Sequence, residues 1–255
     1  MPDSDQELLI LQLSDTHLHA TRQSRMRGVN THDTLKQALD HVRAQAQWPP
    51  DLVLATGDLV QDESRDGYEM FRDLLRPLGV DVACIPGNHD DPALMRYVLS
   101  EPPFQVGGTI EMGGWGIILL DTFLFGNDGG ELGANALCEL ANQLELLGER
   151  HALIAMHHQP IDMGSAWLDG VGLKDSEAFL GLVDGFPNVS GVLWGHVHQA
   201  SDRLRGKVRM LSTPSTCSQF RPHTDHFALD DRPPGYRWLK LQPDGQIDTE
   251  LVWVE

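Results

Sequence analysis

The chain has 255 residues, of which 41% are hydrophobic and 22% charged, a balance typical of a globular protein with one large core. We therefore expect a single domain over residues 1–255. The formal net charge of −18 argues against a broad nucleic-acid surface, which needs clustered lysine and arginine. It does not exclude an anionic substrate, because bound cations can dominate the field within a site.

The three cysteines, Cys84, Cys138 and Cys217, are widely spaced and odd in number. This pattern argues against a disulfide framework and favours reduced, buried or half-buried thiols. Residues 1–7 are polar and acidic, unlike a signal peptide, and no apolar run is long enough to span a membrane. We therefore expect a cytoplasmic protein.

Short apolar runs that read as buried strands alternate with segments of helical periodicity along most of the chain. Strands are expected at residues 8–13, 51–56, 80–85, 115–120, 151–156 and 189–193. Helices are expected at residues 34–46, 68–75, 93–99, 135–147 and 176–183. The first strand–helix–strand unit favours a right-handed crossover between parallel strands. Residues 203–255 lack long helical periodicity, and Pro243-Asp244-Gly245 predicts a turn between antiparallel strands.

Side chains that can bind metals follow five of the predicted strands, at the point where each strand ends. They are Asp15 and His17, Asp58, Asn88 and His89, His157, and His196 and His198. Residues i and i+2 of a strand share a face, which predicts that both members of the Asp-x-His and His-x-His pairs point into one pocket. Carboxylates, imidazoles and an amide oxygen suit Mn, Fe or Zn. Five such fragments in this order therefore predict a metal site, with Asp58 bridging two ions.

Two polar loops are candidates for contacts with the rest of a substrate. Residues 19–33 carry Arg25 and Arg27, and form either a solvated loop or contacts to a phosphate or base. Residues 161–175, which include Trp167, form either a lid or a surface loop. The sequence leaves both alternatives open.

Residues 213–220 are a third candidate loop. Ser215, Thr216 and Gln219 can hydrogen-bond a base, and Phe220 can stack on it. Because loops rich in serine and threonine are common, an ordinary surface loop is the alternative.

The five motifs together resemble those of calcineurin-like metallophosphoesterases. In this sequence they read Asp15-Thr16-His17, Gly57-Asp58, Gly87-Asn88-His89-Asp90, His157 and Gly195-His196-Val197-His198. Within that family, residues 14–18, 57–62 and 213–220 are similar to bacterial class III 3′,5′-cyclic-AMP phosphodiesterases. The resemblance implies an α/β fold, a four-layer α-β-β-α sandwich of two mixed sheets flanked by helices.

The resemblance also implies two metal ions, Fe and/or Mn, with Zn or Co as alternatives. The ligands of one ion would be Asp15, His17, Asp58 and His198. The ligands of the other would be Asp58, Asn88, His157 and His196. The catalytic residues implied are Asp58 and His89, the latter to stabilise phosphoryl charge or protonate the departing ribose oxygen. The substrate contacts implied are His17, Asn88, His89 and His198.

One position departs from the family pattern. Many members carry an aspartate three residues after the Gly-Asp aspartate, and this aspartate orients the catalytic histidine. Here that position is Gln61, so we expect Asp62 or Asp90 to orient His89 instead. His158 directly follows one of the implied ligands and is expected to pack behind it.

The leading functional hypothesis is a binuclear-metal phosphodiesterase that hydrolyses 3′,5′-cyclic AMP to 5′-AMP by in-line attack of a metal-bridging hydroxide. The alternative is the same site acting on another small phosphoester, such as a 2′,3′-cyclic nucleotide, a glycerophosphodiester or a phosphomonoester. A non-enzymatic scaffold is disfavoured, because all seven implied ligand positions are filled. The expected partner is a small cyclic nucleotide, with no nucleic acid and no membrane, and the protein is expected to be a monomer or homodimer.

Overall fold

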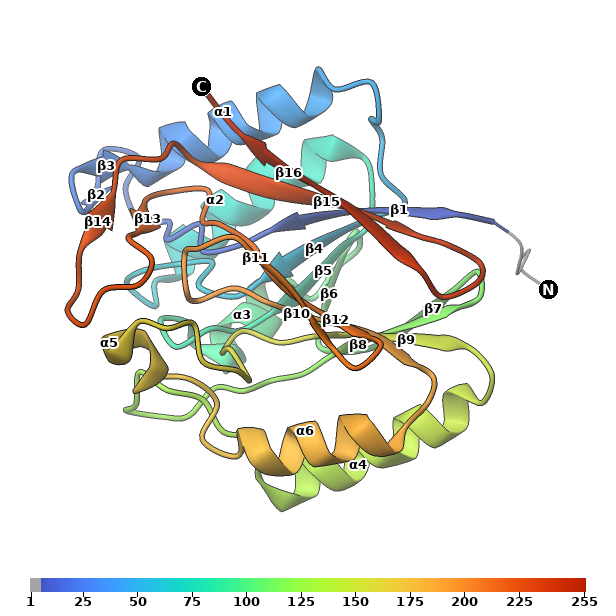
Figure 1. Ribbon diagram of the computed structural model, residues 1–255. Helices are drawn as coiled ribbons and strands as arrows, with labels where there is room; N and C mark the ends of the chain where they lie inside the picture. Colours follow the sequence, from blue (N-terminus) through green and yellow to red (C-terminus); the bar gives the residue numbers. More distant parts are fainter. Residues whose placement is uncertain (1–5) are drawn as a thin grey trace.

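The computed structural model describes residues 6–255, and its centre consists of two six-stranded β-sheets (Figure 1). Residues 1–5, part of the polar N-terminal segment considered above, lie outside the described residues. The first sheet has the order β16 (Ile247–Trp253), β15 (Gly235–Leu241), β1 (Leu8–Leu13), β4 (Leu52–Thr56), β5 (Val82–Ile85) and β6 (Phe104–Val106). The second has the order β11 (Ser201–Arg205), β12 (Val208–Ser212), β10 (Val189–Trp194), β9 (His151–Ala155), β8 (Trp115–Leu119) and β7 (Gly108–Met112).

Both sheets are mixed, with a parallel centre and antiparallel strands toward the edges. In the first sheet β1, β4, β5 and β6 are parallel, and the β15–β16 hairpin pairs antiparallel with β1. In the second, β8, β9, β10 and β12 are parallel, and β7 and β11 pair antiparallel at the two edges. The predicted parallel pair and the predicted hairpin at Pro243-Asp244-Gly245 are confirmed.

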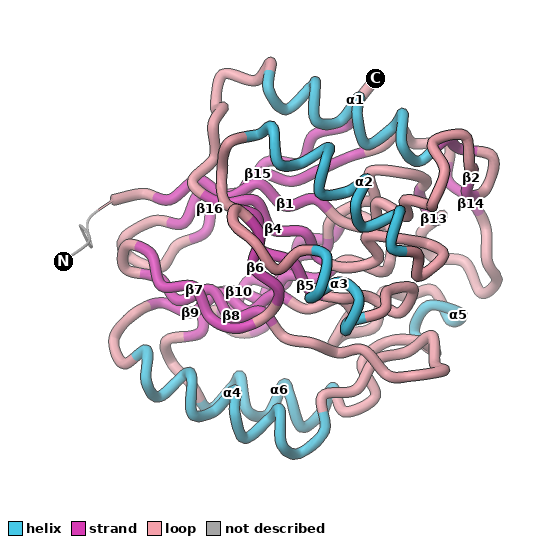
Figure 2. Tube along the Cα trace, turned by 180° about the vertical axis from the view of Figure 1, so that it is seen from behind, coloured by secondary structure: helices cyan, strands magenta, loops and turns pink. Residues whose placement is uncertain are grey.

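Helices cover the outer face of each sheet, which gives the predicted four layers (Figure 1, Figure 2). On the first sheet lie α1 (Thr31–Arg43), α2 (Arg65–Leu75) and α3 (Pro92–Val98), with the 3₁₀ turn η1 (Arg76–Leu78) after α2. On the second sheet lie α4 (Gly133–Leu147) and α6 (Ser176–Gly185). Within residues 6–255, none of the helices combines the length and apolar character needed to cross a lipid bilayer.

The central strands are buried on both faces, which explains why they read as continuous apolar runs. In β1, Ile10 packs between the sheets, whereas Leu11 and Leu13 pack under the helices. β9 alternates in the same way, with Leu153 between the sheets and Ile154 under the helices. The core therefore extends through all four layers and fixes the two sheets relative to each other.

The N-termini of the first two helices differ from the prediction. α1 begins at Thr31, three residues earlier than predicted, because the Asn30 side chain accepts a hydrogen bond from Asp33 N at 3.1 Å and caps it. α2 also begins three residues earlier than predicted, after a serine cap. The first turns of both helices are polar, so the helical spacing of apolar residues does not reveal them. α3 begins at Pro92, one residue earlier than predicted, with Asp91 as its N-cap.

Several short elements were not predicted. Besides β6 and β7, they are the hairpin of β2 (Arg25–Met26) and β3 (Val29–Asn30), the hairpin of β13 (Gln219–Phe220) and β14 (Leu229–Asp230), and α5 (Ala166–Asp169). The two hairpins and α5 lie at the same end of the molecule in both views (Figure 1, Figure 2). The three candidate loops of the sequence analysis are therefore neighbours in space.

One buried cation joins the two sheets. Arg237, on β15, is only 3% exposed. Its Nη2 donates to the carbonyl oxygens of Ser212 at 2.8 Å and Ser201 at 3.2 Å, both in the second sheet. Its Nη1 donates to Thr249 Oγ1 on β16 at 2.9 Å.

We expect Arg237→Met to lower the free energy of unfolding by about 1–3 kcal/mol, because buried acceptors lose their donor. Urea unfolding would measure this change. Arg205→Met is the matched control, since its ion pair with Asp184 is exposed to solvent and should contribute little to the free energy of unfolding. Equal effects of the two substitutions would contradict a linking role for Arg237.

Candidate metal centre and active site

The loops after five parallel strands meet at one edge of the sandwich, beyond the carboxyl ends of β1, β4, β5, β9 and β10. They bring together all eight predicted site residues: Asp15, His17, Asp58, Asn88, His89, His157, His196 and His198. Six of these line a pocket of about 510 Å³. The other two, Asp15 and His157, lie beneath it with no exposed surface.

The residues converge for a different reason from the one predicted. β1 ends at Leu13 and β10 at Trp194, so the Asp-x-His and His-x-His pairs lie beyond the strands and not within them. Five of the predicted ligands instead have left-handed backbones, with φ of 54° at Asp15, 46° at His17, 50° at Asp58, 63° at His196 and 47° at His198. Such a backbone costs a non-glycine residue about 1–3 kcal/mol and is typical of functional sites.

Hydrogen bonds hold these strained turns against one another. Asp15 N donates to Gly57 O at 3.0 Å, and His17 N donates to Asp58 O at 2.9 Å. His196 N donates to both carboxylate oxygens of Asp15, at 3.0 and 3.1 Å. The turn after β1 is therefore tied to the turns after β4 and β10.

Glycines in the motifs allow the turns to approach closely. A Cβ atom at Gly195 would lie 2.7 Å from Thr56 O and 2.8 Å from Asp15 Oδ2. A Cβ atom at Gly87 would collide with the carboxylate of Asp58. Any larger residue at these positions would push the predicted ligands Asp15 and Asp58 away from their neighbours.

Asp15, His17 and His198 form a first group of donors. His198 Nε2 lies 3.0 Å from His17 Nε2 and 3.3 Å from Asp15 Oδ1. His198 Nδ1 donates to Ser218 O at 2.6 Å, which leaves a lone pair on Nε2. Two imidazole lone pairs at this separation repel unless a proton or a cation lies between them.

Asn88, His157 and His196 form a second group. His157 Nε2 lies 3.2 Å from Asn88 Oδ1, and its Nδ1 donates to Thr56 O at 2.8 Å. The ring of His196 packs edge-on against that of His157, with centroids 5.1 Å apart. The carbonyl partner of His157 again orients the free nitrogen toward the centre.

Asp58 lies between the two groups. Its Oδ2 is 3.4 Å from His157 Nε2 and 3.7 Å from His17 Nε2. Its Oδ1 accepts a hydrogen bond from His89 N at 2.9 Å. One carboxylate oxygen thus reaches donors of both groups, which is the geometry that a bridging ligand requires.

Burial and mutual charge set the protonation states of the centre. Burial lowers the pKa of His17 and of His196 to about 3. Burial opposes the charge on Asp58, but its pairing with His157 outweighs this and holds the pKa of Asp58 well below its usual value. The same pairing overcomes burial and raises the pKa of His157 to about 9. The centre therefore offers a carboxylate at Asp58 and neutral imidazoles at His17 and His196, the forms that bind metals.

The donor set fits metal ions. The donor atoms of Asp15, His17 and His198 lie within 4.8 Å of one another, as do those of Asp15, Asp58 and His157. The buried atom His196 Nε2 has no hydrogen-bond partner among the described residues. Carboxylate and imidazole donors without thiolates suit transition metals such as Mn, Fe or Zn.

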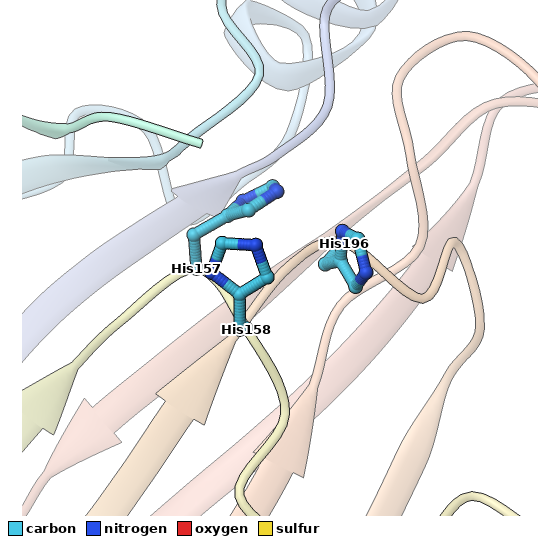
Figure 3. Close-up of side chains that lie close together, drawn as sticks. All are labelled: His157, His158 and His196. Carbon is cyan, nitrogen blue, oxygen red and sulfur yellow. The ribbon is translucent and has the colours of Figure 1, made fainter. Parts of the chain in front are cut away.

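His158 also lies in this cluster, beside His157 and His196 (Figure 3). Its Nδ1 is 2.8 Å from Thr122 Oγ1, and its Nε2 is 3.2 Å from Asp128 O. Burial lowers the pKa of His158 well below its usual value, so the ring is neutral. Both nitrogens already have protein partners, which gives His158 the packing role expected from the sequence.

The residue that contacts His89 is neither of the two predicted. Gln61 Nε2 lies 3.0 Å from His89 Nδ1. Asp62 instead accepts a hydrogen bond from Ala20 N at 3.0 Å. Asp90 is fully buried and accepts hydrogen bonds from three backbone N–H groups and a tyrosine hydroxyl. The prediction was wrong because it required a carboxylate, whereas an amide at the family position makes the contact.

The polar residues of the 213–220 loop do not line the pocket. Ser215 Oγ donates to a backbone carbonyl of the turn after β1, and the Gln219 side chain bonds the Ser215 backbone through both its oxygen and its nitrogen. Phe220 does line the pocket, but one face of its ring stacks on His198. The loop therefore supports the turns that carry the predicted ligands, and Phe220 is its one residue that lines the pocket.

Arg27, Trp167 and Phe227 are among the pocket residues that the sequence missed or left open. Arg27 and Trp167 line the pocket, so their loops are not merely solvated. Phe227 lines it as well and was not predicted. It lies in a segment without apolar periodicity, where only tertiary packing reveals it.

Comparison with known proteins is consistent with this geometry. The sequence matches the calcineurin-like phosphoesterases over residues 8–200, a span that includes every predicted metal ligand. The chain belongs to the calcineurin-like phosphoesterase family. Family membership and the buried cluster together support two bound metal ions.

Relatives of this phosphoesterase match over its whole length. It is 39% identical over 254 residues to the 3′,5′-cyclic adenosine monophosphate phosphodiesterase CpdA of Pseudomonas aeruginosa, covering 100% of this chain and 93% of that protein. It is 38% identical over 243 residues to the CpdA of Escherichia coli K12, covering 95% and 88%. A dimetal phosphatase from Danio rerio has a similar fold, with a TM-score of 0.66 at 14% identity over 97% of this chain and 99% of that one.

We expect Gly195→Ala to displace Asp15 and so reduce both the bound metal and the activity, with about 1–3 kcal/mol lost from the free energy of unfolding. Elemental analysis and urea unfolding would measure these changes. Gly181→Ala, in α6, is the matched control because its Cβ has open space and should be neutral or slightly stabilising. Full metal content in Gly195→Ala would show that the close approach is not needed.

Proposed function

We propose that this protein is a metal-dependent phosphodiesterase that hydrolyses 3′,5′-cyclic AMP to 5′-AMP. The observation that carries the proposal is the Asp58 carboxylate, which reaches His17 and His157 at the floor of a pocket of nucleotide size. Full-length similarity to curated 3′,5′-cyclic-AMP phosphodiesterases supports the choice of substrate.

In this proposal each donor group holds one ion. One set of ligands is Asp15, His17, Asp58 and His198, and the other is Asp58, Asn88, His157 and His196. When bound, the two ions would act as Lewis acids toward the phosphate and lower the pKa of an attacking water. Because the donors are carboxylates, imidazoles and one amide, we infer Fe and/or Mn as the occupants, with Zn or Co as alternatives.

The residues around the proposed ions position the substrate and move a proton. His17, Asn88 and His198 line the pocket and would face the phosphate. Gln61 occupies Nδ1 of His89, which leaves Nε2 free toward the pocket. Formation of 5′-AMP adds the hydroxyl of the attacking water to phosphorus and breaks the bond between phosphorus and the ribose 3′ oxygen. The proton of that water ends on the 3′ oxygen, and the Nε2–H of His89 would donate a hydrogen bond that stabilises the charge developing there.

We also infer a cytoplasmic monomer or homodimer whose partner is a small cyclic nucleotide. The three cysteines are unpaired, which suits a reducing compartment, although Cys138 is exposed and not buried as expected. The net charge of −18 disfavours long nucleic acids as substrates. Size-exclusion chromatography with light scattering would decide the oligomeric state.

We expect Mn-reconstituted protein to convert 3′,5′-cyclic AMP to 5′-AMP, to lose this activity on chelation and to regain it when Mn is restored. Parallel assays would use 2′,3′-cyclic AMP, glycerophosphocholine and p-nitrophenyl phosphate. Faster turnover of one of these would assign the site to another phosphoester. No turnover of any substrate by protein shown to hold metal would contradict an enzymatic role.

Two substitutions should separate metal binding from catalysis. Asp58→Ala should lose both metal and activity, because this carboxylate serves both donor groups. His89→Ala should keep its metal while turnover falls by about 10²–10³, the usual cost of removing a group that stabilises the transition state. Metal content would be measured alongside kcat. Loss of metal from His89→Ala would show that His89 is a ligand.

A further inference from the structure

The pocket has two chemically different ends. One end carries the metal-ligand side chains described above. The other end is lined by Met26, by Arg27 and by an aromatic wall. We define the aromatic wall as Trp167, Phe220 and Phe227. These residues belong to α5, to the β13–β14 hairpin with its connecting loop, and to the β2–β3 hairpin with its turn. A ligand with an anionic end and a planar apolar end would match this division.

The aromatic wall is continuous with the metal centre. Its three ring centroids are each 5.3 Å apart, with interplanar angles of 66°, 78° and 72°. This is the edge-to-face arrangement that aromatic rings favour. Phe220 in turn stacks on His198, with centroids 4.0 Å apart and an angle of 7°. The wall therefore begins one ring away from a proposed metal ligand.

Arg27 packs on the wall from the opposite loop. Its guanidinium carbon lies 4.6 Å from the centroid of the Phe227 ring, a cation–π contact. Arg27 and Gly28 have φ of 52° and 86°, the signs of a type I′ hairpin turn. Arg25 Nη1 donates to Gly28 O at 2.9 Å and so holds this turn. The hairpin thus fixes a cation with several N–H donors at the pocket.

Trp167 has a polar group that the protein does not use. Its Nε1 is buried and has no hydrogen-bond partner among residues 6–255. A buried indole N–H normally has an acceptor, and Trp167 lines the pocket. Because this N–H is itself inaccessible, the ring of Trp167 is the surface that the residue offers to a ligand in the pocket.

We propose that the aromatic wall and Arg27 form a nucleobase subsite, an inference that rests on the proposed function. In a 3′,5′-cyclic nucleotide only the ribose separates the base from the phosphate, so a base next to the metal centre would meet the wall. Aromatic side chains stack on any base, and the Arg27 N–H groups can donate to its ring nitrogens or carbonyl oxygens. The subsite favours phosphoesters that carry a nucleobase over phosphoesters that carry another substituent. Among nucleobases it favours purines over pyrimidines, because purines have the larger stacking area.

The test compares a substrate that carries a base with one that lacks it. Trp167→Ala and Phe227→Ala should each lower kcat/KM for 3′,5′-cyclic AMP by about 5- to 100-fold, mainly through KM, because stacking is lost. Neither should change kcat/KM for methyl riboside 3′,5′-cyclic phosphate, which keeps the phosphodiester ring without the base. Phe125→Ala is the matched control, because its ring is 91% exposed and outside the pocket.

An equal loss on both substrates, or no loss on either, would overturn the subsite. Phe227 is 41% exposed, so Phe227→Ala is expected to fold and can be used for the test if Trp167→Ala does not fold.

Calorimetric measurement of the binding of 5′-AMP and of ribose 5-phosphate to Mn-loaded protein separates the subsite from the proposed function. Tighter binding of 5′-AMP without any cyclic-nucleotide turnover would keep the subsite and overturn the proposed function. Turnover of both cyclic phosphates with equal kcat/KM would keep the function and overturn the subsite.

Discussion

The Asp58 carboxylate has to reach two groups of donors from one position, and most of the site geometry follows from this constraint. Asp58 follows β4, in the interior of the first sheet, while His157 follows β9 in the second. The site can therefore exist only where the two sheets end at a common edge. The core between the sheets fixes that edge, and the buried Arg237 adds hydrogen bonds across it. The four-layer fold thus sets the distance between the two groups.

Backbone strain is the local cost of this arrangement. Five of the predicted ligands have a left-handed backbone, at about 1–3 kcal/mol each, which only a large and well-packed core can offset. Asp90 stabilises the same region by accepting backbone hydrogen bonds from the turns after β4 and β5. Glycines at 87 and 195 remove the side chains that would collide there. Strain, close packing and buried charge therefore occur at the same few residues.

The two ends of the pocket depend on different parts of the fold. The metal end is built from turns that directly follow the parallel strands, so the sheets determine its geometry. The aromatic end is built from short hairpins and a four-residue helix outside both sheets. Elements of this kind can change without disturbing the core. Substrate choice within a common reaction is therefore expected to depend on residues such as Trp167 and Phe227.

The sequence alone predicted the central strands and the eight residues of the centre, because buried strands and ligand motifs are local patterns. The mixed four-layer fold was implied by the resemblance to calcineurin-like metallophosphoesterases. It did not determine how Asp15 and His17 converge, since left-handed turns depend on hydrogen bonds to residues after β4 and β10. It also missed the Gln61–His89 contact and Phe227. The single-domain assignment over residues 1–255 stays a prediction. Only the tertiary structure decided which side chains line the pocket. These residues come from segments that are far apart in the sequence, and no periodic pattern of residues links such segments.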